Sequence, residues 1–374
     1  MSSTPTEPDR PRARTAASRA RLRGSPAIRS EVLALLLGVA GALAGIGIGA
    51  SLLTGTRPLS GDPSIGQAAA IASFVVAVPI AAAVLLLLTR RREPWLQSVP
   101  RWRLIADVAV LSLVHGLLAF FLVSGAFLVF QTAFVGVALD RVAGTFWVAI
   151  SSAATAYVVA SSAQALTTRS LASLLAVFVI VGVLSAAMVS PDPFWWERYF
   201  SVLGAQSDQS GLRFNITLLL TGIALVTVSE GVAHDLRVWA EHMGESRWRV
   251  QVVHAALATI GVLVAAVALI PMNVNRTAHD VAAKSLVVVF GLILLTFPVL
   301  LHRLPGGLRA LTTVALGLLI TLIVLYEGLD YLNMTAFEMG ASITTYAWLL
   351  LFVRTVNAAA DGVRSLPAST GAPT

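Results

Sequence analysis

Polar residues in the C-terminal half of the chain carry groups that could bind a polar ligand or move a proton. Ser201 supplies a hydroxyl, His279 an imidazole, and Asp280 and Glu338 supply carboxylates. Such groups support nucleophilic or general acid–base chemistry when they lie within hydrogen-bond reach of one another. The candidate ligand-binding residues are Ser201, Asn215, His279, Asp280, Glu338, Trp195, Trp196 and Arg213.

These residues meet only if the connection 190–213 folds over a helix bundle. A polar pocket formed in that way, with Trp195 and Trp196 at its rim, would suit a lipid headgroup. Simpler roles stay open for the same residues. The tryptophans are typical of anchors at the membrane interface, and an acid such as Asp280 just before a span favours the helix dipole.

A second candidate cluster consists of Glu230, His234 and His254. Glu230 and His234 are four residues apart and share one face of a helix, and His254 begins the next apolar segment from the same side. The three could couple protons or bind a metal, although no fixed metal-binding spacing is present. Pairing of charges at a helix end is the simpler interpretation, so we predict no metal and no cofactor.

Other ionisable residues fall within or near apolar segments, where a charge is costly and marks a functional candidate. Arg103 and Asp107 are four residues apart, and we predict that they form an ion pair. His115 is predicted to be a neutral, hydrogen-bonded interior histidine, with a proton relay as the alternative.

Motifs of several enzyme classes are absent. The sequence contains no G-x-x-x-x-G-K-[ST], H-E-x-x-H or G-x-S-x-G, which removes support for ATP hydrolysis, zincin chemistry and nucleophile-elbow esterase chemistry. It also contains no cysteine, so disulfides, thiolate catalysis and cysteine-ligated metals are excluded. We assign no catalytic residue and expect a protein that is not an enzyme.

The elements that must position these residues are membrane-spanning helices. The chain of 374 residues is 57% hydrophobic and only 12% charged, with a mean hydropathy of +0.82. Apolar runs of about 20 residues, enough to cross a ~30 Å hydrocarbon core, predict an all-α polytopic transmembrane bundle. The predicted spans are 32–54, 67–89, 104–130, 143–166, 171–189, 214–234, 251–270, 285–301, 310–329 and 339–353.

Small residues predict close helix packing in the N-terminal spans. Gly41, Gly45 and Gly49 form two successive Gly-x-x-x-Gly steps in the first span. Ser152 and Thr155 are among several small hydroxyl residues in the fourth. Both patterns are typical of surfaces on which helices approach closely.

Basic residues set the predicted orientation. Of the 26 Lys and Arg residues, 20 lie in segments on one side of the predicted spans, and the positive-inside rule assigns that side to the cytoplasm. We therefore predict a multi-pass protein of the cell membrane with both termini cytoplasmic. The basic excess fits topology signalling and contact with anionic lipid rather than nucleic acid. Membrane lipids are the predicted partners, and the cytoplasmic loops are candidate surfaces for a protein partner.

Four parts are predicted along the chain. They are a disordered Arg-rich cytoplasmic tail over 1–30, a four-helix transmembrane region over 31–170, a six-helix transmembrane unit over 171–356 and a flexible cytoplasmic tail over 357–374. The N-terminal tail has almost no large apolar side chain, so it cannot offset its ordering entropy. The apolar run 32–54 exceeds the length of a signal-peptide h-region, which favours an uncleaved first span.

The six-helix unit also carries an ordered series of short motifs. The series is Ser201-x-Leu203-Gly204, Phe214-Asn215, Arg249-x4-His254, His279-Asp280, Glu338, Trp348 and Arg354. Over roughly 171–354 it resembles the bacterial family called domain of unknown function 998, which is distantly similar to the damage-regulated autophagy modulator and Sfk-type membrane proteins. The resemblance implies a six-helix membrane unit and supplies no catalytic residue. Because the eukaryotic relatives are associated with lipid distribution and membrane remodelling, it suggests a lipid-related role.

Three functions are compatible with these features. We expect a lipid-interacting or membrane-remodelling protein that acts through a polar pocket on the extracytoplasmic face. The first alternative is a transporter or permease subunit, although no inverted repeat and no paired broken helices are recognisable. The second is an intramembrane hydrolase, which needs Ser201 and His279 within hydrogen-bond reach.

Overall fold

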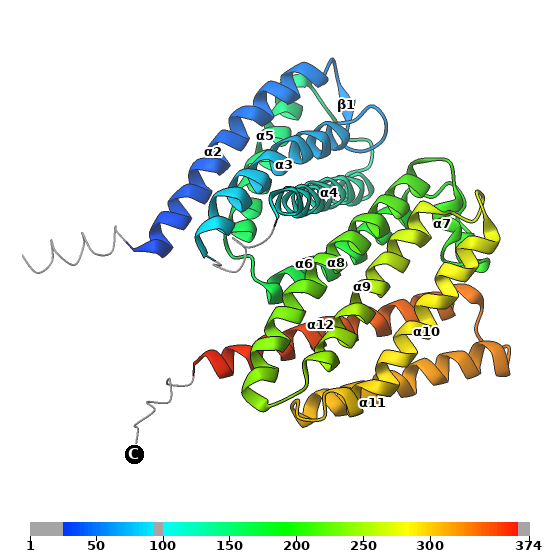
Figure 1. Ribbon diagram of the computed structural model, residues 1–374. Helices are drawn as coiled ribbons and strands as arrows, with labels where there is room; N and C mark the ends of the chain where they lie inside the picture. The colour runs from blue at the N-terminus through cyan, green and yellow to red at the C-terminus, as the bar shows by residue number, and fades with distance from the viewer. Residues whose placement is uncertain (1–24, 93–99, 366–374) are drawn as a thin grey trace, which may run out of the picture. The chain divides into compact units, whose positions relative to one another are not determined.

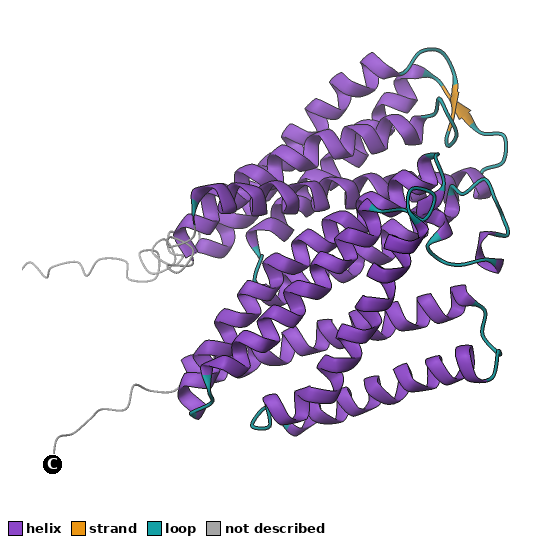
Figure 2. Cartoon of the chain, turned by 45° about the vertical axis from the view of Figure 1, so that its right-hand side comes forward, coloured by secondary structure: helices purple, strands orange, loops and turns teal. Residues whose placement is uncertain are grey.

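The computed structural model describes residues 25–92 and 100–365 and is almost entirely helical (Figures 1 and 2). Ten of the described helices are long and apolar enough to cross a membrane, as predicted. A helix satisfies its own backbone N–H and C=O groups, which the hydrocarbon core requires. The chain is therefore an integral membrane protein with an all-α, multi-pass fold. The ten helices are α2 Pro26–Leu52, α3 Ile65–Arg92, α4 Arg101–Ala133, α5 Arg141–Gln164, α6 Thr168–Met188, α8 Gln209–Met243, α9 Arg247–Leu269, α10 Arg276–Leu300, α11 Gly306–Ile323 and α12 Met334–Arg364.

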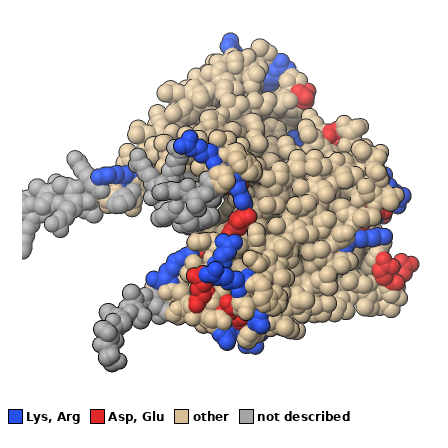
Figure 3. Space-filling model, viewed as in Figure 1, with Lys and Arg blue, Asp and Glu red and all other residues tan. Residues whose placement is uncertain are grey.

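The face of the molecule seen in Figure 3 is mainly uncharged. Figure 3 shows Lys, Arg, Asp and Glu side chains in small groups, with wide stretches of other residues between them. Large apolar side chains such as Leu36, Leu87, Val142 and Val299 are exposed. Contiguous apolar surface of this kind is unfavourable in water and suits contact with lipid.

Polar side chains define where the spans begin. Asp140, Asp208, Asn275 and Asn333 cap α5, α8, α10 and α12, and each accepts a hydrogen bond from a backbone N–H of the first turn. Such a cap satisfies one of the donors that a helix leaves unpaired at its start. Hydropathy alone does not locate these caps, so the observed helix starts differ from the predicted ones.

The largest difference at a helix start occurs in α10, which begins at Arg276 instead of residue 285. Its first turns are polar, and a search for apolar runs misses them. His279 and Asp280 lie inside the helix, so the prediction that they precede a span is wrong. The cap is Asn275 rather than Asp280.

The predicted tails lie mostly outside the described residues. This applies to residues 1–24 of the N-terminal tail and to residues 366–374 of the C-terminal tail. Residues 357–364 were predicted as part of the flexible tail, but they belong to α12. The polar side chains that suggested a tail there pair with α8, as described below.

The helices group into two compact units. Of the described residues, the first contains 25–92 and 122–165, and the second contains 100–121 and 166–365. The division therefore falls inside α4, whereas the sequence placed a boundary after residue 170. Hydropathy marks each span but carries no information about which spans pack together.

In the first unit, α2 and α3 both pack against α5. A Cβ built on Gly41 would lie 2.7 Å from the carbonyl oxygen of Ser152, and one on Gly45 would lie 2.8 Å from the Cα of Ala149. Only glycine allows this approach. Small residues predicted close packing for each of these two spans, and the structure shows that they pack against each other. Two short strands, β1 Arg57–Pro58 and β2 Ala138–Leu139, pair antiparallel in the same unit.

In the second unit, successive helices form a closed ring. α8 packs against α9, α9 against α10, α10 against α11, α11 against α12, and α12 against α8. Helix α6 packs outside the ring against α8 and α12. Between α6 and α8 lie two short helices, η2 Trp195–Glu197 and α7 Val202–Ala205, and α11 continues into the π-helical η3 Val324–Gly328.

Aromatic residues fill one part of this ring. Trp348 of α12 is buried, packs edge-on against Phe290 and Phe297 of α10, and stacks on Phe352. Its indole N–H donates to the hydroxyl of Thr312 on α11, at 3.0 Å. Trp348 therefore joins three helices of the ring and satisfies its polar atom inside an apolar site.

Candidate functional site

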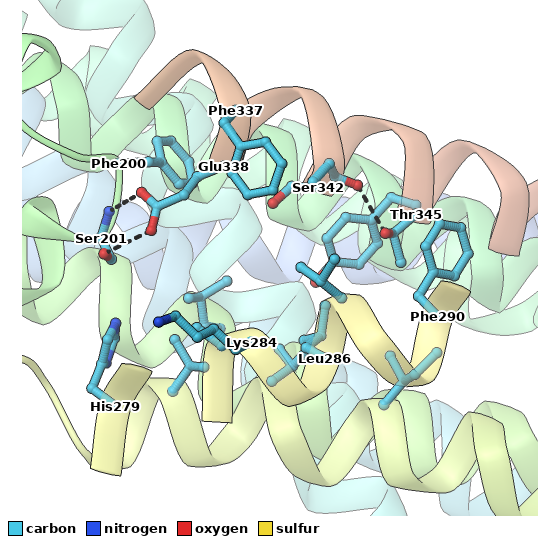
Figure 4. A pocket seen from close by; sticks show the side chains of 18 of the residues that line it. Phe200, Ser201, His279, Lys284, Leu286, Phe290, Phe337, Glu338, Ser342 and Thr345 are labelled. Atoms are coloured by element: carbon cyan, nitrogen blue, oxygen red, sulfur yellow. Dashed lines mark hydrogen bonds between the residues drawn. The ribbon is translucent and has the colours of Figure 1, made fainter. Parts of the chain in front are cut away.

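A cavity of about 160 Å³ lies inside the ring formed by α8 to α12. All five of these helices and the segment before α7 contribute to its wall. Figure 4 shows Ser201, His279, Lys284 and Glu338 gathered at one end and the side chains of Leu286 and Phe290 further along. The cavity thus has a polar end and a longer apolar part.

Ser201 and Glu338 form the polar contact at this end. The backbone N–H of Ser201 donates to Oε2 of Glu338 at 3.2 Å, and its hydroxyl donates to Oε1 at 3.1 Å. Ser201 is 8% exposed and directly precedes α7, while Glu338 lies in the first turns of α12. The connection between α6 and α8 thus reaches the start of α12 through a pair of hydrogen bonds.

His279 supplies a polar atom that bonds to none of the described residues. Its Nδ1 lies 2.9 Å from the carbonyl oxygen of Ile270, at the end of α9. Its Nε2 is buried and, among the described residues, has no hydrogen-bond partner. The side chain is only 4% exposed. A buried polar atom of this kind costs free energy unless something else bonds to it.

The rest of the wall is mainly apolar. Phe214 and Leu218 come from α8, Ile260 and Val264 from α9, and Leu319 from α11. On α12 the lining runs from Met334 to Leu349, and the part below the polar end runs from Glu338 to Leu349. At ~1.5 Å per residue this is a distance of about 16 Å along the helix, roughly half the thickness of a hydrocarbon core.

Of the eight residues predicted to bind a ligand, three line the cavity: Ser201, His279 and Glu338. Asn215 instead donates to the carbonyl oxygen of Gly204 at 2.8 Å. A Cβ built on Gly204 would lie 2.5 Å from Asn215 Oδ1. Asn215 and Gly204 therefore hold α7 against α8, which positions Ser201 indirectly.

Arg213 also makes contacts away from the cavity lining. It donates to the hydroxyl of Ser185 on α6 at 2.7 Å and to Gln209 at 3.3 Å. Its guanidinium lies over the rings of Phe120 and Phe121, with centroid distances of 5.5 and 5.9 Å. These contacts place Arg213 between α4, α6 and α8.

The remaining predicted residues lie outside the lining as well. Trp195 packs against Phe200, and Trp196 is exposed while its carbonyl oxygen accepts a hydrogen bond from Asn333. Asp280 lies 4.0 Å from Arg276, one turn earlier in α10. Both tryptophans thus help to hold the connection, and Asp280 takes part in an exposed ion pair of small energetic weight.

Sequence reasoning missed several lining residues. They are Phe200, Lys284, Phe337, Ser342, Thr345 and Tyr346, among others. Ser342, Thr345 and Tyr346 follow Glu338 at helical spacing on α12, which is a signal that could have been read once the helix was assumed. The opposing residues of α8 and α9 have no such signal, because apolar residues look alike in sequence whether they face a cavity or a neighbouring helix.

The geometry does not support hydrolysis through Ser201 and His279. The Ser201 hydroxyl is directed to Glu338, and His279 Nε2 bonds to no group in the part of the chain that the structure describes. A nucleophile and its base need a heavy-atom distance of about 2.6–3.2 Å.

Two of the three residues of the second predicted cluster meet. Glu230 Oε1 lies 3.3 Å from His254 Nε2 and 3.0 Å from the guanidinium of Arg103. His234 lies one turn further along α8 and is partly buried. Within residues 25–92 and 100–365 there is no group of three or more His, Cys, Asp or Glu that could hold a metal. The arrangement is a charge cluster that joins α4, α8 and α9.

The same cluster corrects one prediction. Arg103 pairs with Glu230 rather than with Asp107, and Asp107 accepts a hydrogen bond from Thr227 of α8 at 2.7 Å. Both partners lie on another helix, which spacing along α4 cannot reveal. His115 is buried, and its Nδ1 lies 2.8 Å from the carbonyl oxygen of Leu111, as expected for an interior histidine.

Two further polar groups join ring helices. Asp235 of α8, which is 4% exposed, accepts from Arg364 at 2.7 Å and from Asn357 at 3.0 Å. Glu245, between α8 and α9, lies 2.8 Å from Arg249 and 3.4 Å from His302. The contacts of Asp235 and the contact between Glu245 and His302 connect elements distant in sequence and are structural.

No protein-family model, curated protein or solved structure matches the chain. The resemblance described above therefore rests on its motif residues. In the structure these residues occupy the second unit, where Trp348 lies in the ring and Glu338 lines the cavity.

Proposed function

We propose that this integral membrane protein binds a membrane amphiphile in the cavity of the α8–α12 ring, without turnover. The observation that carries the proposal is the buried Nε2 of His279, which has no hydrogen-bond partner among the described residues and belongs to a side chain that lines the cavity. A ligand headgroup would supply that partner. The resemblance to a family with lipid-associated relatives points in the same direction.

The distribution of polarity favours an amphiphile over a water-soluble ligand. Ser201, His279 and Glu338 gather at one end, and Phe, Leu, Val and Ile side chains line most of the remainder (Figure 4). Ligand sites typically combine an apolar wall with a few polar groups that fix orientation. Here the polar groups would hold the headgroup and the apolar wall would hold part of a chain.

The proposal places the polar end of the cavity on the extracytoplasmic face. The distribution of arginine supports this orientation, because the connections at the other ends of these helices are richer in basic residues. The absence of cysteine from the sequence allows a direct test with single cysteines. An impermeant maleimide added to whole cells should label Thr277→Cys and not Ser246→Cys. The opposite pattern would refute the orientation.

Occupation of the cavity can be tested by filling it. Ser342 lines the cavity on α12, and Ala347 of the same helix is exposed and does not line it. Ser342→Phe should lower labelling of the purified full chain by a photoactivatable phospholipid to the level of non-specific labelling. Ala347→Phe should leave labelling unchanged, since it adds the same ring outside the cavity.

Equal labelling of the wild-type chain and of both variants would show that lipid does not enter the cavity and would end the proposal. Peptide mapping of the labelled wild-type protein provides a second readout. The labelled peptides should come from α10 and α12 rather than from the first unit.

A further inference from the structure

The polar end of the cavity presents hydrogen-bond acceptors. The carbonyl oxygen of Ile270 can only accept, so the nearby Nδ1 of His279 must carry the proton in that 2.9 Å contact. In the neutral imidazole this leaves Nε2 as an acceptor. This buried atom has no partner among the described residues, so a ligand that binds it must donate a hydrogen bond.

Glu338 adds carboxylate oxygens that accept hydrogen bonds. Its two oxygens each receive one donor from Ser201, at 3.2 and 3.1 Å. A carboxylate that accepts one hydrogen bond at each oxygen still has further lone pairs available. Among the described residues Glu338 forms no salt bridge, so its charge is left for a cationic ligand group.

Lys284 adds a positive charge at the same end. It lines the cavity on α10 and is exposed, and in the described chain it forms no salt bridge either. Figure 4 shows its amine on the side of the cavity where Ser201, His279 and Glu338 lie. An ammonium and a carboxylate that do not pair with each other complement a ligand that carries both signs of charge.

The depth of the cavity below its polar end points to one leaflet. From Glu338 to Leu349 the wall rises about 16 Å, near half of a ~30 Å hydrocarbon core. A lipid of one leaflet has its headgroup at the surface and its chain ends near the middle of the bilayer. The cavity has the same direction and a matching depth, although its volume of about 160 Å³ suits only part of such a lipid.

We propose that the preferred ligand is a zwitterionic phospholipid with a primary ammonium, of the phosphatidylethanolamine class. Its ammonium would donate to Glu338 and to His279 Nε2, and its phosphate would lie toward Lys284. This inference rests on the proposed function, since it specifies the headgroup bound at the same cavity. A quaternary ammonium has the charge but no N–H donor, and a glycerol headgroup has donors but no positive charge.

The experiment is native mass spectrometry of the full chain in detergent, with dioleoyl phosphatidylethanolamine, phosphatidylcholine or phosphatidylglycerol at equal concentration. Phosphatidylethanolamine should bind about tenfold more tightly than phosphatidylcholine, because charge-assisted N–H hydrogen bonds are lost in the latter. Glu338→Gln keeps an acceptor for Ser201 but removes the charge, and it should abolish the preference. Glu327→Gln, an exposed carboxylate outside the lining, should keep it.

Each outcome separates the two proposals. Equal binding of all three lipids, lost in Ser342→Phe, would overturn the headgroup assignment and leave amphiphile binding intact. A preference for phosphatidylglycerol would do the same. Binding that is unaffected by Ser342→Phe would overturn both. An unchanged helical circular dichroism spectrum and a monodisperse elution peak for Glu338→Gln would show that loss of preference is not loss of fold.

Discussion

The two units of the molecule hold their helices together in different ways. In the first, α2 and α5 approach until the backbone at Gly41 and Gly45 touches Ser152 and Ala149. In the second, a glycine contact occurs between Gly222 and Gly261 of α8 and α9, but the ring closes through larger side chains and polar pairs. Backbone contact leaves no space between helices, whereas a ring of side chains can leave a cavity. A binding site is therefore expected in the second unit.

Substitution of one partner in a polar pair of the second unit should have the largest effect on stability. Arg364→Met leaves the Asp235 carboxylate, which is 4% exposed, with only the neutral Asn357 amide as a donor. We expect a loss of about 2–4 kcal/mol in the free energy of unfolding, since a buried charge loses its partner. Chemical unfolding of the variant and of the wild-type chain in detergent measures this loss. Arg354→Met, which removes an exposed arginine of the same helix, is the control and should cost less than ~0.5 kcal/mol.

A substitution at the glycine contact of the first unit should lower the free energy of unfolding by nearly as much. Gly45→Ala puts a methyl group 2.8 Å from the Cα of Ala149, so α2 and α5 must separate. We expect a loss of about 1–3 kcal/mol in the free energy of unfolding, as for an overpacked core. Gly47 lies on the same helix with nothing within 4 Å of its Cβ position. If Gly45→Ala proved as stable as Gly47→Ala, close packing would not distinguish this unit.

The cavity of the second unit should tolerate added volume. Ser342→Phe places a ring in a space of about 160 Å³, similar to cavities that accept benzene. We expect a change of less than ~1 kcal/mol in the free energy of unfolding, in contrast to the single methyl group of Gly45→Ala. Thermal unfolding of the two variants side by side makes the comparison. A larger loss of stability for Ser342→Phe would mean that the cavity has no usable space for the phenyl group.

Much of the fold follows from hydropathy. Runs of about 20 apolar residues identified all ten spans, and the glycines of the first span identified its packing face. The ends of the helices were harder to predict from hydropathy. The polar turns at the start of α10 and the end of α12 fall outside apolar runs, yet caps and side-chain pairs make them helical.

The site was only partly predictable. Ser201, His279 and Glu338 stand out as polar groups near apolar runs, and these three do line one cavity. Asn215 and Asp280 look similar to these residues in sequence. In the structure, however, Asn215 bonds to Gly204 of α7 and Asp280 forms an exposed ion pair with Arg276. Residue type shows which chemistry a side chain can perform, but it does not show whether that side chain points to a cavity or to a neighbouring turn.

The sequence by itself determined that the protein lies in a membrane and that it has ten membrane-spanning helices, because the length of apolar runs depends only on local composition. Tertiary structure alone decided the ring of α8 to α12, the pairing of Ser201 with Glu338 and the burial of a His279 nitrogen that bonds to no described residue. These features join residues from separate helices. Their distances depend on how whole helices pack, and no local pattern in the chain records that packing.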